Sequence, residues 1–165
     1  MSYIKIRIYN SIFEDMEHIK IISAEETIVV RHPVLREGKP VDSCVFAGDE
    51  LETTVHLGYF QSDNLLGVVT LLEKNFDTYQ GNGIQLRGMA VMPNQQGKGI
   101  GGKLVVQAEQ AMQKKNAAYI WMNARLIAVP FYEKLGYQTV SSLFDIPLVG
   151  PHYTMLKKLA KLEDI

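Results

Sequence analysis

A glycine-rich stretch, QQGKGIGGKL at residues 95–104, has residue types that can hold phosphate groups. Glycines let backbone amides approach a ligand closely, and the amides at a helix start favour negative charge. Gly97, Gly99 and Gly102 fit the dinucleotide pattern G-x-G-x-x-G. The pair Gly102-Lys103 also completes a P-loop pattern, G-x-x-x-x-G-K, that begins at Gly97. The stretch therefore predicts a phosphate-binding turn, and its neighbours must decide which ligand it holds.

Both nucleotide patterns are incomplete. A P-loop needs Ser or Thr after the lysine to hold Mg²⁺, and Leu104 stands there. A dinucleotide site needs an acidic residue about 20 residues further on, to hold a ribose hydroxyl. The chain has no acid between Glu109 and Glu133, and the next predicted strand ends at Asn123. The residues therefore disfavour both nucleotides.

A third pattern, [RQ]-x-x-G-x-[GA], fits Gln96, Gly99 and Gly101. This pattern cradles the pyrophosphate of coenzyme A in acyltransferases, and it needs only a helix start with free amides. The alternative is a turn between a strand and a helix that binds nothing. Such a turn does not require four glycines within residues 97–102, because each glycine costs conformational entropy on folding.

The motifs around this stretch resemble those of the GNAT N-acetyltransferase superfamily. Residues 86–140 contain, in family order, L-x-x-M-A-V-x-P, Q-x-x-G-x-G and A-x-x-F-Y-E-K-L-G-Y. The resemblance implies an α/β fold of the mixed α+β kind. Its central sheet is mostly antiparallel, contains one splayed parallel strand pair and is flanked by helices. Residues 84–92 and 118–122 would form that pair, with acetyl-CoA between them.

The resemblance also implies which residues bind acetyl-CoA. Backbone groups of Met89, Ala90 and Val91 would pair with the pantetheine arm, as if the ligand were an added strand. The residues implied for the pyrophosphate are Gln96, Gly97, Lys98, Gly99, Gly101 and Gly102. Asn123 matches a position whose side chain bonds the pantetheine arm, and an N-cap of the following helix is the equally weighted alternative.

Tyr132 matches the family tyrosine that lies near the thioester sulfur. A phenol can give the departing thiolate a proton or a hydrogen bond while an amine attacks the thioester carbonyl. The alternative is a core aromatic, because Phe131, Tyr132 and Leu135 are spaced for packing. The resemblance favours the catalytic role.

The motifs leave the general base and the acceptor open. Many family members have a glutamate on the strand before the loop, but residues 84–89 contain no carboxylate. Candidate bases elsewhere are Glu73, Asp145 and His152, or solvent acting on an amine of low pKa. Candidate acceptor-binding residues are Arg31, His32 and His152. Arg and His would suit a carboxylate or phosphate on the acceptor, whereas the acids within residues 42–52 would suit a polyamine or aminoglycoside.

The pattern of apolar residues predicts the elements that must position these groups. A strand at residues 4–8 precedes a helix that starts at the capping box of residues 11–14 and turns Met16, Ile19 and Ile22 inward. Residues 27–36 fit a strand by their β-branching or a helix by the resemblance, and Pro33 should interrupt either one. Further strands are predicted at 54–61, 65–73, 84–92, 118–122, 137–143 and 153–158, further helices at 99–115 and 127–135, and irregular chain at 36–52 and 145–151.

Composition and charge limit the remaining functions. A chain of 165 residues, 47% hydrophobic, suits a single domain over residues 1–165. A formal charge of −1 predicts no nucleic-acid or membrane partner. No apolar stretch approaches the ~18–20 residues of a membrane span. No Cys/His cluster has the spacing of metal ligands, so no metal is predicted. We therefore expect a cytoplasmic acetyl-CoA-dependent enzyme that acetylates an amine of a small molecule or a protein.

Three points about the function of this chain stay open. The chain could be a non-catalytic acetyl-CoA-binding module that senses metabolism or mediates assembly, because the strand carboxylate is missing. It could transfer an acyl group other than acetyl. A homodimer is compatible with the family, in which dimers are common.

Overall fold

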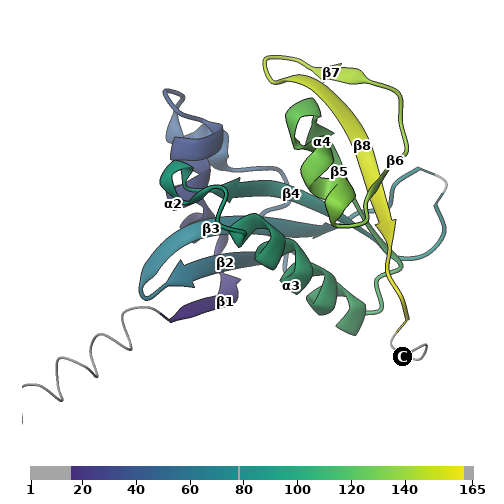
Figure 1. Cartoon of the computed structure of the whole chain (residues 1–165), viewed down its shortest axis with the longest axis horizontal. Coiled ribbons are helices and arrows are strands. Elements are labelled where there is room, and N and C mark those ends of the chain that lie inside the picture. The colour runs from purple at the N-terminus through teal and green to yellow at the C-terminus, as the bar shows by residue number, and fades with distance from the viewer. Residues whose placement is uncertain (1–15, 78, 162–165) are drawn as a thin grey trace, which may run out of the picture. The chain divides into compact units, whose positions relative to one another are not determined.

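The computed structural model describes residues 16–77 and 79–161 (Figure 1). The predicted strand at residues 4–8 and the capping box at residues 11–14 lie outside this part. Within it the strands are β1 Glu17–Ile22, β2 Val55–Gln61, β3 Asn64–Glu73, β4 Gly83–Val91, β5 Tyr119–Arg125, β6 Gln138–Thr139, β7 Phe144–Ile146 and β8 Gly150–Lys158. The α-helices are α2 Ala24–Leu35, α3 Ile100–Lys114 and α4 Val129–Lys134, and short 3₁₀ helices occupy Val41–Cys44, Pro93–Gln95 and Leu126–Ala128.

The strands join in the order β1-β2-β3-β4-β5-β8-β6, and β7 pairs with β8. β4 and β5 run parallel, whereas β1 with β2 and β8 with β5, β6 and β7 run antiparallel. This mixed, mostly antiparallel sheet with one parallel pair and helices confirms the predicted fold class. The chain divides into two compact units, Met1–Thr70 with Gly88–Val105 and Leu71–Arg87 with Val106–Ile165.

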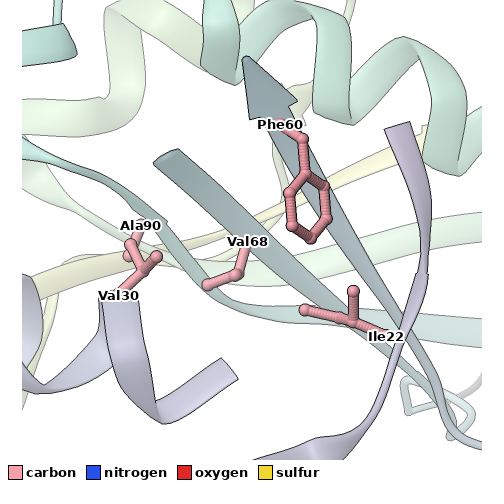
Figure 2. Packing of buried hydrophobic residues seen from close by; sticks show 5 residues of the cluster. All are labelled: Ile22, Val30, Phe60, Val68 and Ala90. Atoms are coloured by element: carbon pink, nitrogen blue, oxygen red, sulfur yellow. The ribbon is translucent and has the colours of Figure 1, made fainter. Parts of the chain in front are cut away.

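The first unit has a core built from five elements (Figure 2). The buried side chains are Ile22 of β1, Val30 of α2, Phe60 of β2, Val68 of β3 and Ala90 of β4. Close packing of such a core fixes the elements that contribute to it. The core therefore holds β4 in place at Ala90, one of the three residues expected to bind pantetheine.

The predicted helix carrying Met16, Ile19 and Ile22 is wrong, because Glu17–Ile22 forms strand β1. β1 pairs along its whole length with β2, from Glu17 opposite Gln61 to Ile22 opposite His56. Apolar residues at spacing three fit a helix, but an edge strand needs few buried positions, and backbone pairing overrides local pattern. Of the three residues only Ile22 is buried, and it enters the core.

The helix interpretation of residues 27–36 is confirmed, and its start is Ser23. The Ser23 hydroxyl accepts from the Glu26 amide at 3.1 Å, and the Glu26 carboxylate accepts from the Ser23 amide at 2.7 Å. This capping box satisfies two amides at the start of α2. Pro33 does not interrupt the helix, which continues to Leu35, because a proline in the last turn removes only one backbone bond.

In the second unit, β5 pairs on both sides. Tyr119–Trp121 lies parallel to Gly83–Gln85 of β4, and the whole of β5 lies antiparallel to β8, from Tyr119 opposite Lys158 to Arg125 opposite His152. The predicted strand at 137–143 shrinks to Gln138–Thr139. Residues 145–151, predicted irregular, instead form the tip of the β7–β8 hairpin seen in Figure 1, with Leu148 at φ 64° in its turn.

The helix predicted at residues 127–135 divides into a 3₁₀ turn and α4. It ends at Gly136 as predicted, with φ 89° and a hydrogen bond from its amide to the Glu133 carbonyl at 2.9 Å. A membrane span would need a longer and more apolar helix than any among residues 16–77 and 79–161. No cluster of three or more His, Cys, Asp or Glu side chains in the described part is arranged to hold a metal.

Candidate active site

The free backbone of β4 is the first part of the candidate site. The parallel pairing with β5 ends at Gln85, whereas β4 continues to Val91. Ala90 is buried in the core of the first unit, and Met89 and Val91 are half-buried. Residues of a strand beyond its paired segment keep backbone donors and acceptors for another extended chain.

The glycine loop follows β4 closely. The Met92 amide donates to the Leu66 carbonyl at 2.9 Å, and the Gln96 side chain donates back to the Val91 carbonyl at 3.0 Å. Gly97 and Gly99 have left-handed backbones, with φ of 79° and 83°. A methyl group added at either glycine would meet no protein atom within 4 Å. The loop is therefore exposed and open on the side where a ligand could approach.

Helix α3 begins with unpaired amides that point into this loop. The first helical bond runs from the Lys103 amide to the Gly99 carbonyl at 3.1 Å, so the amides of residues 100–102 have no acceptor within the helix. Ile100 and Leu104 are buried, and a methyl group at Gly67 of β3 would lie 3.0 Å from each. Close packing on Gly67 therefore anchors a helix start that can receive an anion.

Two lysines lie in or next to this loop. Lys98 is exposed, and its ammonium donates to the Gln95 side chain at 3.0 Å. Lys103 forms an ion pair with Glu17, and the hydrogen bond from Lys103 lowers the pKa of the Glu17 carboxyl below its usual range. Lys103 is thus tied to β1, whereas Lys98 is held only within the loop. Of the two, Lys98 is freer to meet an anionic ligand.

Asn123 is exposed on β5 of the second unit. Its side-chain oxygen accepts a hydrogen bond from the Thr154 hydroxyl of β8 at 3.0 Å. Neither the 3₁₀ turn at Leu126–Ala128 nor α4 has a side-chain cap, so the alternative role of Asn123 as an N-cap is wrong. The bond from Thr154 orients the carboxamide and leaves its amino group as a donor for another partner.

Tyr132 lies on α4, with 6% of its surface exposed. Its ring contacts Phe131 and Tyr137 edge to face, at centroid distances of 4.9 and 5.8 Å. Its backbone carbonyl accepts from the amides of Leu135 and Tyr137 at 3.0 and 3.1 Å, across the turn at Gly136. Burial raises the pKa of the Tyr132 phenol well above its usual value, because the charged form loses its solvation. The side chain therefore stays protonated and is suited to donate.

The three candidate bases have different surroundings in the second unit. Glu73 at the end of β3 and Asp145 on β7 are exposed. His152 on β8 is buried, and its Nδ1 donates to the Gly150 carbonyl at 2.7 Å. That bond fixes the tautomer, so the free lone pair is on Nε2. The ring stacks on Phe144 at 6.0 Å.

Arg31 and His32 lie on α2 of the first unit but differ in exposure. His32 is half-buried, and its Nε2 donates to the Lys39 carbonyl at 2.8 Å. Arg31 has no exposed surface, and its guanidinium pairs with Asp49 at 2.5 Å. Arg31, expected at the acceptor site, is therefore buried in the first unit and paired with a buried carboxylate.

The partners of Arg31 were not predicted from the sequence. They are Asp49, Thr70, the Cys44 carbonyl and, packed against the guanidinium, Gly88. They lie between 13 and 57 residues along the chain from Arg31, so no local sequence pattern predicts these contacts. Gly88 alone carried a signal, because a glycine inside a predicted strand often marks a bulge or a close approach.

Comparisons with known proteins identify a family and a fold. The model of the family described as the acetyltransferase (GNAT) family matches residues 14–137. The Bacillus subtilis (strain 168) protein named uncharacterized N-acetyltransferase YitI is 30% identical over 145 residues, covering 87% of this chain and 97% of that protein. Two solved structures, each 16% identical, share the fold. Escherichia coli ElaA has a TM-score of 0.70 and covers 86% of this chain and 99% of its own. An aminoglycoside 6'-N-acetyltransferase complexed with coenzyme A has a TM-score of 0.69 and covers 87% of this chain and 97% of its own.

Proposed function

Because the chain belongs to the acetyltransferase (GNAT) family, we propose that it transfers the acetyl group of acetyl-CoA directly to a primary amine of a small molecule or a protein. The observation that carries this proposal is the start of α3. There, exposed glycines and three amides without helical acceptors leave open space for a pyrophosphate. Residues 14–137, which match the family, come from both compact units, so we propose that the units serve one catalytic domain.

In this proposal the first unit binds the donor. The amides of residues 96–102 hold the pyrophosphate, and Lys98 adds a charge-assisted contact. Backbone groups of Met89, Ala90 and Val91 pair with the amides and carbonyls of the pantetheine arm. The geometry of the loop supports these roles, because a methyl group at Gly97, Gly99 or Gly102 would meet no protein atom that already fills the space.

In the second unit, Tyr132 stabilises the leaving group and Asn123 orients the pantetheine arm. The amine attacks the thioester carbonyl, the carbon–sulfur bond breaks, and the Tyr132 hydroxyl donates a hydrogen bond that stabilises the departing thiolate. The raised pKa of Tyr132 supports this role, because the phenol keeps its hydrogen and can donate a hydrogen bond while negative charge develops on the sulfur. The Asn123 amino group bonds the pantetheine arm. Residues 84–89 offer no carboxylate, so the proton of the amine leaves to solvent or to one of the candidate bases Glu73, Asp145 and His152, and the thiolate takes up a proton from solvent.

The test is turnover of acetyl-CoA with a panel of primary amines, followed by release of free thiol and by the mass of the acetylated product. The Tyr132→Phe variant should lose roughly 100-fold in turnover, the lower end of what one hydrogen-bond donor to a developing charge contributes. Its dissociation constant for coenzyme A should stay within about twofold, since binding rests on other residues. Tyr79→Phe, which removes the same hydroxyl from another ring of the second unit, should behave as wild type.

The outcomes separate the alternatives. Binding of coenzyme A without product from any amine would indicate a sensor or assembly module rather than an enzyme. Failure to bind coenzyme A would overturn the proposal as a whole. Unchanged turnover in Tyr132→Phe would remove only the role of the tyrosine.

A further inference from the structure

A closed ring of hydrogen bonds lies buried in the first unit. Arg31 Nη1 donates to Asp49 Oδ2 at 2.5 Å and to the Cys44 carbonyl at 3.0 Å, and Nη2 donates to Thr70 Oγ1 at 2.6 Å. The side chains of Arg31 and Asp49 are 0% and 1% exposed. Val30, the neighbour of Arg31 on α2, points into the apolar core (Figure 2). The guanidinium is therefore held by α2, β3 and the chain between α2 and β2.

His56 of β2 closes the ring and fixes its direction. Its Nε2 lies 2.9 Å from the Asp49 carbonyl, which can only accept, so Nε2 carries the hydrogen. Its Nδ1 lies 2.7 Å from Thr70 Oγ1 and accepts the hydroxyl hydrogen when the ring is neutral. Thr70 thus accepts from Arg31 and donates to His56. Each group in the ring has one orientation, which makes the guanidinium a rigid element.

Phe46 and Gly88 both pack against this guanidinium. The Arg31 Cζ atom lies 4.4 Å from the centre of the Phe46 ring. On the β4 side, a methyl group at Gly88 would lie 2.9 Å from Nε and from Nη2. Gly88 also has φ +58°, a left-handed conformation inside a strand that is typical of a β-bulge, where a strand bends. Arg31 therefore supports the backbone at the bend of β4, one residue before Met89.

Stability alone does not explain this arrangement. A buried ion pair costs desolvation, and well-packed apolar residues of similar volume often stabilise a protein as well or better. Arg31 Nε is buried and has no hydrogen-bond partner among the described residues, which is itself unfavourable. An apolar core could fill the same space without an unpaired donor. What it could not supply is a planar, directionally fixed support for a bent strand.

We propose that Arg31, fixed by Asp49 and Thr70, is a positioning residue that holds the bend at Gly88 and so directs the backbone groups of Met89–Val91 toward pantetheine. This inference rests on the proposed function, since it concerns how β4 binds coenzyme A. It gives Arg31 a role behind β4 in place of contact with the acceptor.

The experiment replaces the pair without leaving a lone buried charge, using the double variant Arg31→Met/Asp49→Leu. Binding is measured by calorimetry with two probes. One is coenzyme A, and the other is adenosine 3'-phosphate 5'-diphosphate, which lacks the pantetheine arm. The double variant should bind coenzyme A about tenfold more weakly and the fragment as wild type does. Its unfolding midpoint in urea should stay close to that of wild type.

Thr27→Val is the matched control on the same helix. Thr27 is fully buried, and its hydroxyl donates to the Ala24 carbonyl at 2.6 Å without touching Gly88. This variant should lose stability but bind both probes as wild type does. Arg31→Lys, which keeps the charge but not the planar fork, should fall between wild type and the double variant in affinity for coenzyme A.

The proposal is overturned if the double variant folds and binds coenzyme A as wild type does, or if both probes weaken equally. If the double variant does not fold, Thr70→Val decides, because it removes only the hydroxyl bridge. It should weaken coenzyme A binding about threefold, with recovery in Thr70→Ser and no change for the fragment. Equal affinities in Thr70→Val and wild type would then reject the proposal. Failure of wild type to bind either probe would instead reject the proposed function.

Discussion

Gly88 on β4 and Gly99 before α3 share a left-handed backbone, with φ of 58° and 83°, but their surroundings are opposite. A methyl group at Gly88 would collide with the buried guanidinium of Arg31 at 2.9 Å. A methyl group at Gly99 would meet nothing within 4 Å. Interior atoms thus fill the space beside one glycine, whereas the space beside the other is empty.

This difference separates two uses of glycine in one unit. At Gly88 the missing side chain lets a polar interior group support the strand from behind. At Gly99 it leaves room in front of the helix start, where the amides of residues 100–102 have no acceptor within the helix. The backbone conformation is similar, so only the neighbours distinguish a supporting contact from a binding surface.

The largest effect is expected from Gly88→Ala. The side chain would strain a left-handed residue and overlap Arg31, at a combined cost of about 2–4 kcal/mol in the free energy of unfolding. Urea unfolding monitored by circular dichroism measures this cost. Gly38→Ala is the control, because Gly38 has φ 71° and open space around it, so it carries the backbone strain alone. Equal losses in the two variants would mean that the contact with Arg31 contributes nothing.

Gly99→Ala should reduce ligand affinity more than stability, the reverse of what is expected for Gly88→Ala. No protein atom obstructs the added methyl group, so the free energy of unfolding should fall by only about 1 kcal/mol, from backbone strain. The affinity for coenzyme A should fall about tenfold, because the methyl group occupies the approach to the helix amides. Calorimetry with coenzyme A and with adenosine 3'-phosphate 5'-diphosphate measures it, and both ligands should weaken together. Unchanged affinity for both would show that the pyrophosphate lies elsewhere.

The two regions also differ in how well the sequence predicted them. The glycine loop, the β2–β3 hairpin and the strand before the loop carry local signals, namely turn residues and an apolar run, and all three were predicted within a few residues. Local chemistry decides such segments, because their conformation depends on neighbours in the sequence. The candidate site in front of α3 therefore follows largely from the sequence.

The contacts of Arg31 behind β4 could not be predicted from the sequence in the same way. Arg31, Asp49 and Thr70 meet only after α2, the following loop and β3 have packed, and an arginine on a helix is ordinarily solvated. Strand β1 was missed for a related reason, since only pairing with β2 distinguishes its apolar spacing from that of a helix. Contacts between residues distant in sequence decide both features.

A smaller effect is expected from Ser23→Ala, which weakens the start of the helix that carries Arg31. Loss of the capping hydroxyl should lower the free energy of unfolding by about 1 kcal/mol, with no change in affinity for coenzyme A.

The hydrogen bond from the Ser23 amide lowers the pKa of the Glu26 carboxyl. A depressed pKa stabilises the fold above the ordinary glutamate range, and the gain is lost as the pH falls through the lowered value. The advantage of wild type over Glu26→Gln should therefore shrink in acid, and a constant difference would contradict the assignment.

The smallest effect is expected from Lys98→Gln, in the exposed glycine loop before α3. Lys98 is exposed and bonded only to Gln95 within the loop, so its attraction to a pyrophosphate is screened by solvent and salt. Affinity for coenzyme A should fall roughly two- to threefold at low ionic strength and converge with wild type as salt is raised. Lys114→Gln makes the same charge change in the last turn of α3 and should leave affinity unaltered. Equal losses in the two variants would point to net charge, whereas a loss confined to Lys98 locates the anion at the start of the helix.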